Sequence, residues 1–178
     1  MYDRPIRNEP MAVKHEIKSQ LAKLLATEDL IVEHRQTETA CFNVETRVLT
    51  LPLWDKASST VYDMLVGHEV GHALFTPNLD IPGSIPMQFV NIVEDVRIEK
   101  LMKRRFPGLT KSFFKGYSEI HNDDFFALEG QDVNEMNLAD RANLYFKIGN
   151  HLDIKFKSDE KSLIRKIADA ETWEDVLE

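Results

Sequence analysis

The apolar residues of this chain recur mostly three and four positions apart, a spacing that predicts helices over much of its length. The strongest patterns cover residues 61–75 and 87–105, and the second of them ends at Phe106-Pro107-Gly108. Weaker helical patterns are present at about residues 110–122, 138–152 and 159–169, with Ser158 as the expected cap of the last, and a short helix opens at Thr172.

A further helix is expected at the start of the chain, from about residue 8 to about residue 27. Proline is tolerated in a first turn, so Pro10 fits its beginning. Its buried stripe is expected to consist of Ile17, Leu21, Leu24 and Leu25.

The pattern changes between residues 37 and 53, where short β-type runs replace the helical spacing. Apolar residues alternate before and after the turn at residues 45–47, which predicts a β-hairpin that Pro52 ends. These residues are Ala40, Phe42, Val44, Val48, Leu49 and Leu51. We therefore predict a helix-rich α+β fold with a small sheet beside the helix at residues 61–75.

The 178 residues are expected to form a single domain, with a core over about residues 1–130 and a helical part over about residues 131–178. A net charge of -8 argues against nucleic acid as a partner. No apolar run approaches the length of a membrane span, and no signal-peptide core begins the chain, so we expect a cytoplasmic protein with no membrane partner. The single cysteine, Cys41, excludes an internal disulfide framework and is expected to be buried.

The segment His68-Glu69-Val70-Gly71-His72 carries the chemistry of the chain. Two histidines four apart on a helix lie one above the other and can hold one metal ion. Glu69 is rotated by about 100° from His68, which suits a base acting on a metal-bound water. The alternative is a surface helix with two solvated histidines, but both share a face with bulky apolar residues and should point inward.

A catalytic zinc usually has three protein ligands and an open position for water, so one more ligand is needed. The pattern HExxHxxGxxH is excluded, because Phe75 and Asn78 stand where it has Gly and His. Glu94, 22 residues after His72, lies in the middle of an apolar helix face and is the expected third ligand. The alternative for this carboxylate is a buried salt bridge with Arg97.

The function expected from these residues is hydrolysis of a peptide or protein substrate with one Zn²⁺ per chain. Glu69 is the expected general base, and residues 47–51 are expected to offer a strand edge to the substrate. Tyr117 is the expected donor to the oxyanion, with His121 and His151 as alternatives. The rival hypotheses are a catalytically silent domain that binds protein partners, and a helical interaction domain without metal.

With His68, Glu69, His72 and Glu94 in these positions, the chain resembles the gluzincins, the thermolysin-like zinc metallopeptidases. The resemblance implies a zincin-like fold with a small sheet next to the HExxH helix and a second ligand-bearing helix. Gluzincins carry an acidic residue four positions after the third ligand, where it orients a ligand histidine. Here that position is Ile98, and Asp95 or Glu99 would have to substitute from other angles, since both are expected to point elsewhere.

A longer stretch, including residues 46–47, 68–77, 91–99 and 106–109, resembles the predicted metallopeptidase region of large T-even-type tailed phages. In such proteins the region often precedes a von Willebrand A-type domain. The resemblance implies the host cytoplasm as the location, and a further C-terminal domain or a partner protein. The capping-box pattern at Thr172, so near the end, agrees with a native chain that continues beyond Glu178.

Overall fold

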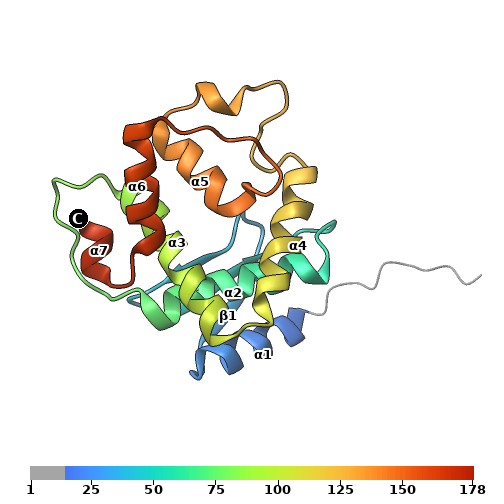
Figure 1. Cartoon of the computed structure of the whole chain (residues 1–178). Helices are drawn as coiled ribbons and strands as arrows, with labels where there is room; N and C mark the ends of the chain where they lie inside the picture. The colour runs from blue at the N-terminus through green and yellow to red at the C-terminus, as the bar shows by residue number, and fades with distance from the viewer. Residues whose placement is uncertain (1–14) are drawn as a thin grey trace, which may run out of the picture.

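One long helix, α2 (Ser59–Phe75), runs through the middle of the domain, and the other elements are arranged around it (Figure 1). The computed structural model describes residues 15–178. The elements before α2 are α1 (His15–Ala26), β1 (Ile31–Arg35), β2 (Cys41–Asn43) and β3 (Val48–Pro52). Those after it are α3 (Met87–Arg105), α4 (Leu109–Asn122), the 3-10 turn η1 (Val133–Glu135), α5 (Leu138–Ile148), α6 (Ser158–Asp169) and α7 (Trp173–Leu177). The coarse prediction of a helix-rich α+β fold with a small sheet is confirmed.

The sheet has the strand order β1-β3-β2, so β3 is its central strand. β2 and β3 form the predicted antiparallel hairpin, with Cys41 opposite Thr50, and the Asn43 side chain accepts two backbone N–H groups of the turn. β1 pairs parallel to β3 and was not predicted. Cys41 is exposed, against the expectation of burial, because it shares the exposed face of β2 with Asn43 while Phe42 faces the other way.

α2 is buried on nearly all sides, because α1, α3, α4 and the sheet all pack against it. Two glycines allow this close packing. A Cβ on Gly71 would lie 2.7 Å from Cδ1 of Ile98 on α3, and a Cβ on Gly116 of α4 would lie 2.6 Å from Cβ of Met64. Such distances are far below van der Waals contact, so larger residues would push α3 and α4 away from α2.

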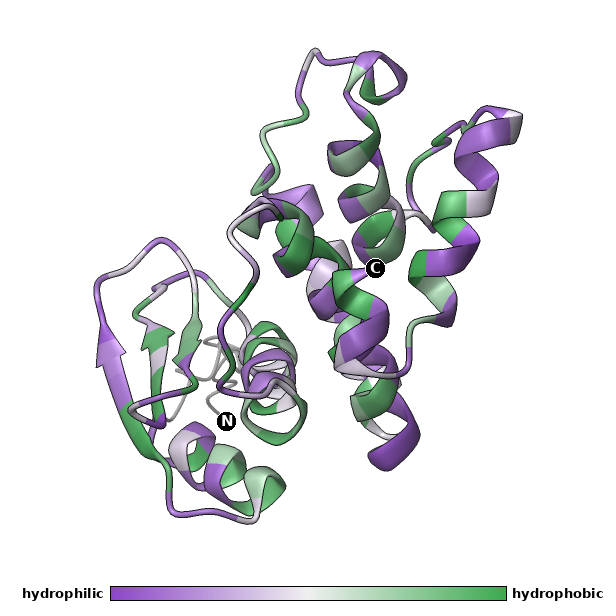
Figure 2. Cartoon of the chain, turned by 90° about the vertical axis from the view of Figure 1, so that its left-hand side faces the viewer, coloured by the Kyte–Doolittle hydropathy of each residue, from purple (hydrophilic) through white to green (hydrophobic). Residues whose placement is uncertain are grey.

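The C-terminal helices α5, α6 and α7 pack on α3, on the side away from the sheet (Figure 1). Arg141 of α5 forms a two-pronged ion pair with Glu160 of α6, with nitrogen–oxygen distances of 2.6 and 3.1 Å. Lys100 of α3 donates to the carbonyl oxygens of Ala168, in the last turn of α6, and Ala170, which follows that helix. Figure 2 shows purple and green bands along these helices, as expected for elements with one exposed and one buried side.

Most predicted helix ends are confirmed, including the end of α3 at Arg105 and the capping box at Thr172. The predicted start of the first helix lies outside the described residues. Its predicted stripe is partly wrong, because Ile17 and Leu24 are exposed while Lys18 is buried against Asp63 of α2.

Two ends in the C-terminal part differ from the prediction. α5 ends at Ile148, and the cap of α6 is Lys157, with the Glu160 carboxylate accepting its backbone N–H; Ser158 lies inside the helix. Within residues 15–178, no helix combines the length and the apolar character needed to cross a membrane.

Candidate metal centre

His68 and His72 lie one turn apart on α2, with ring centroids 5.0 Å apart. Their side chains keep 14% and 19% of their surface exposed, so both are largely inside the protein yet reachable from a pocket. This is the inward orientation that the sequence predicts. Helical geometry therefore brings two imidazoles to one place without any long-range contact.

The carboxylate that meets the two rings is that of Asp95 on α3. Its Oδ1 lies 3.5 Å from Nε2 of His68 and 3.3 Å from Nε2 of His72. A tetrahedral ion with bonds of about 2.0–2.2 Å has ligand atoms about 3.3–3.6 Å apart, so Oδ1 stands at the right separation from both nitrogens. Within the described part of the chain, these three residues form the only group of His, Cys, Asp or Glu close enough to hold a metal ion.

Glu94 is not part of this cluster, in which Asp95 occupies the place that the sequence analysis assigns to Glu94. The Glu94 carboxylate is buried, as predicted, but Arg97 holds it with two hydrogen bonds of 2.7 Å. The alternative of a buried salt bridge is thus the one that the structure contains. The cause is angular: Glu94 lies on the side of α3 that faces the end of α2, where Arg97 also donates to the carbonyl of Phe75.

The Nδ1 atoms of both histidines have partners of their own, which leaves Nε2 free to face Asp95. Nδ1 of His68 lies 3.0 Å from Oε1 of Glu99, and Nδ1 of His72 lies 2.9 Å from Oγ1 of Thr76. Partners of this kind fix the tautomer and the ring orientation of metal-binding histidines. Glu99 therefore faces His68, whereas the sequence analysis expects it to point away from the site.

The Thr76 hydroxyl connects two parts of this network. It donates to Oε1 of Glu94 at 2.5 Å, and its oxygen is then available to accept the N–H of His72. Glu94 thus acts on His72 through Thr76, while Arg97 holds Glu94 in place. Glu94, which the sequence analysis expects to be a metal ligand, is therefore linked to His72 by two hydrogen bonds through Thr76.

The Tyr117 hydroxyl donates to Oε1 of Glu99. Tyr117 lines the pocket over the histidines, but its hydroxyl is engaged behind His68, so its role as a donor to an oxyanion stays a prediction. Burial, and then the negative charge of Glu99, raise the pKa of Tyr117 well above its ordinary value, so it stays a neutral donor. His121 and His151 pair with each other outside the residues that line the pocket, with ring centroids 6.1 Å apart.

Glu69 is 5% exposed and lines the same pocket as the two histidines. Burial raises its pKa, and the positive charges of His68 and His72 only partly offset that effect. Burial alone would lower the pKa of His68, but Asp95, Glu99 and Glu69 outweigh it and raise this pKa to about 10. Burial would likewise raise the pKa of Asp95, yet the histidines and Lys147 hold it well below its ordinary value.

A pocket of about 610 Å³ opens over the cluster. Apart from the polar residues at its base, its walls are mostly apolar and include Phe42, Trp54, Leu79, Ile81 and Phe125. β2 and the residues on either side of it border the pocket, through residues 39–42 and Val44. The predicted substrate edge at residues 47–51 is therefore wrong, because β3 is paired on both sides and the strand at the pocket is β2.

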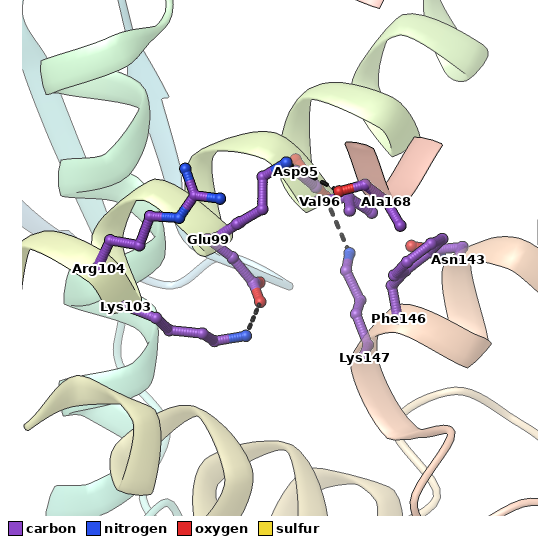
Figure 3. A pocket seen from close by; sticks show the side chains of 10 residues that line it. Asp95, Val96, Glu99, Lys103, Arg104, Asn143, Phe146, Lys147 and Ala168 are labelled. Atoms are coloured by element: carbon purple, nitrogen blue, oxygen red, sulfur yellow. Dashed lines mark hydrogen bonds and ion pairs between the residues drawn. The ribbon is translucent and has the colours of Figure 1, made fainter. Parts of the chain in front are cut away.

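Lys147 of α5 is the member of the site that the sequence did not indicate. Its Nζ lies 3.0 Å from Oδ2 of Asp95, and its side chain is 19% exposed. Figure 3 shows it reaching from α5 to Asp95, beside a second pocket of about 470 Å³ where Lys103 meets Glu99. Because Lys147 is 52 residues from Asp95 in the chain, no local pattern could have connected them.

Comparisons of the chain with models of known protein families, with curated proteins and with solved structures find no match.

Proposed function

We propose that this protein is a zinc-dependent metallopeptidase in which His68, His72 and Asp95 hold one zinc ion and Glu69 is the general base. The observation that carries the proposal is the convergence of Oδ1 of Asp95 with Nε2 of both histidines, at 3.3 and 3.5 Å. Three protein ligands facing an open pocket are typical of catalytic zinc, whereas structural zinc sites are closed by four.

The donor set supports zinc through its chemistry as well as its spacing. Two neutral imidazoles and one carboxylate form a common ligand set of hydrolytic zinc sites. Asp95 is followed four positions later by Glu99, which contacts His68, so the acidic residue expected from the gluzincin resemblance has a counterpart once Asp95 replaces Glu94. The register of the resemblance is thus shifted by one residue, and its third ligand is an aspartate.

A zinc ion held by His68, His72 and Asp95 would supply a bound water that is reactive near neutral pH and would polarise the scissile carbonyl. Glu69 accepts the proton of the attacking water and returns it to the leaving amine. Burial favours this role, because a carboxylate with a raised pKa both accepts and returns a proton more readily near neutrality. Glu99 and Thr76 hold the two imidazoles with Nε2 toward the ion.

The pocket supports an extended peptide or protein segment as the substrate. β2 is an edge strand that borders the pocket, so its unpaired backbone groups can hydrogen-bond to an added strand. The apolar walls, including Phe42 and Ile81, suit a bulky apolar side chain near the scissile bond.

The experiment that tests the proposal compares the wild-type protein with Glu69→Gln. Metal analysis of both should give about one zinc per chain, and hydrolysis of a denatured protein substrate should fall by about 10²–10⁴-fold in the variant. Chelation should abolish the wild-type activity, and added zinc should restore it. Unchanged hydrolysis by the variant would remove the proposed base.

The second candidate is a protein-interaction domain in which zinc is structural. The buried Glu69 argues against it, because a structural site has no use for a costly buried carboxylate beside the ion. A protein that binds zinc but gives no chelator-sensitive cleavage of peptides or denatured proteins would favour this candidate.

A further inference from the structure

We propose that Lys147 is the anion-binding group of this site, and that its ammonium binds the negative charge that develops on the carbonyl oxygen of the scissile peptide bond. This inference rests on the proposed metallopeptidase function and assigns it one more catalytic residue. The same ammonium would bind the oxygen of a small carboxylate placed beside the metal ligands.

The position of Lys147 carries the proposal. It lines the pocket together with His68, Glu69, His72 and Asp95, and its Nζ is 3.0 Å from Asp95. The two oxygens of Asp95 face different partners, with Oδ1 toward the imidazoles and Oδ2 toward Lys147. The ammonium is therefore one carboxylate away from the point where Oδ1 and the two Nε2 atoms converge, and it lines the pocket that a substrate carbonyl would enter.

The hydrogen-bonding capacity of Lys147 is only partly used. An ammonium has three donors, and within residues 15–178 the acceptor recorded for it is Asp95. Two donors are thus left for an oxygen that enters the pocket. The side chain of Lys147 is 19% exposed and lines both the pocket over the histidines and the second pocket, so these donors can be reached by an oxygen from outside.

The other candidates for this task are committed elsewhere. Tyr117 donates to Glu99, behind His68. Lys103 also pairs with Glu99 and lies over the ring of Phe113, and it lines the second pocket rather than the one over the histidines (Figure 3). Among the described residues that line the catalytic pocket, Lys147 is the only lysine or arginine.

The chemistry of the position makes a cation effective there. A fixed positive group in an apolar pocket stabilises developing charge far more than it would in water. Loss of one such donor typically lowers kcat by about 10²–10³-fold. Lys147 sits near the end of α5, so the helical C-terminal part would complete a site whose other groups come from α2 and α3.

The test uses the protein loaded with Co²⁺, whose visible spectrum reports ligand exchange, and acetate as the anion. We compare wild type, Lys147→Met, Lys147→Arg and the matched control Lys103→Met at constant ionic strength. We expect acetate affinity to fall about tenfold or more in Lys147→Met, to stay within about threefold in Lys147→Arg, and to be unchanged in Lys103→Met. Lys147→Gln, neutral and of similar length, replaces the Met variant if that protein does not fold.

Three results would overturn the inference. Acetate affinity equal to wild type in Lys147→Met would make Lys147 a counter-ion only. An equal loss of acetate affinity in Lys103→Met would indicate a general effect of nearby positive charge. Loss of Co²⁺ itself in Lys147→Met would mean that Lys147 positions Asp95. Failure of the proposed function looks different, because wild type would then take up no metal or would bind zinc without chelator-sensitive cleavage, or Glu69→Gln would lose no hydrolysis.

Discussion

Glu94 and Asp95 are neighbours on α3, yet they act on two different nitrogens of the same imidazole. Asp95 places Oδ1 3.3 Å from Nε2 of His72, while Glu94 reaches Nδ1 of that ring through the hydroxyl of Thr76. One carboxylate is thus placed to share a metal ion with His72, and the other to orient His72. The two carboxylates therefore have different expected roles, and substitutions can distinguish them.

Exchanging each carboxylate for its amide should lower zinc affinity to very different extents. Asp95→Asn removes a charged ligand, so zinc affinity should fall by more than about a hundredfold, more than the loss of an outer partner usually costs. Glu94→Gln should keep zinc affinity within about tenfold, because the amide oxygen can still accept from Thr76. Competition with a chromophoric chelator measures both, and a larger loss in Glu94→Gln would restore the ligand role predicted from the sequence.

Glu94→Gln should also lower the free energy of unfolding. Glu94→Gln leaves the Arg97 guanidinium without its charge partner at a position where both side chains are at most 5% exposed. Breaking a buried pair on one side typically costs about 3–5 kcal/mol, so the free energy of unfolding should fall by about that much. Urea denaturation of the metal-free proteins measures this, and an unchanged midpoint would show that Arg97 finds another partner.

For zinc binding, the hydroxyl group of Thr76 should matter more than the size of its side chain. Thr76→Val keeps the shape but loses the bridge between His72 and Glu94, and we expect zinc affinity to fall by about 10–100-fold. Thr76→Ser keeps the hydroxyl and should restore most of it. If the valine variant binds zinc as well as wild type, the orientation of His72 does not depend on Thr76.

Zinc should also change how stability depends on pH. In the metal-free protein the pKa of His68 is raised from 6.5 to about 10, so folding favours its protonated form. The resulting stability is fully present below about pH 6.5 and is lost as the pH rises toward about 10. In zinc-loaded protein His68 must be neutral, so this loss should be absent.

The corresponding measurement is Tm at pH 6 and pH 8.5, with chelator and with one equivalent of zinc. The gap between the two forms should widen at the higher pH. A metal-free Tm that does not fall relative to the loaded form would mean that His68 is neutral in both.

The pair of histidines could be predicted from the sequence because both lie on one helix, where spacing alone determines which side chains share a face. The third carboxylate could not, because it depends on how α3 is rotated against α2. Ile98 and Met102 pack against Gly71 and define the line of contact. At 100° per residue, Asp95 lies about 40° to one side of that line and Glu94 about 60° to the other.

The apolar stripe of α3 was misleading for a physical reason: more than one side of this helix is covered. α2 packs on one side and α5, α6 and α7 on others, so apolar residues alone do not show which side faces the histidines. Lys147 and β1 are similar cases. The first depends on a contact between distant segments, and β1 begins with the exposed Ile31, so the burial pattern that marks a strand is weak there.

The most direct measurement is anomalous diffraction at the zinc edge from crystals of the zinc-loaded protein. We predict one peak, about 2.0–2.2 Å from Nε2 of His68, Nε2 of His72 and Oδ1 of Asp95, with Glu94 still bound to Arg97. The absence of a peak between the histidines, or a peak bound by Glu94 in place of Asp95, would contradict the account.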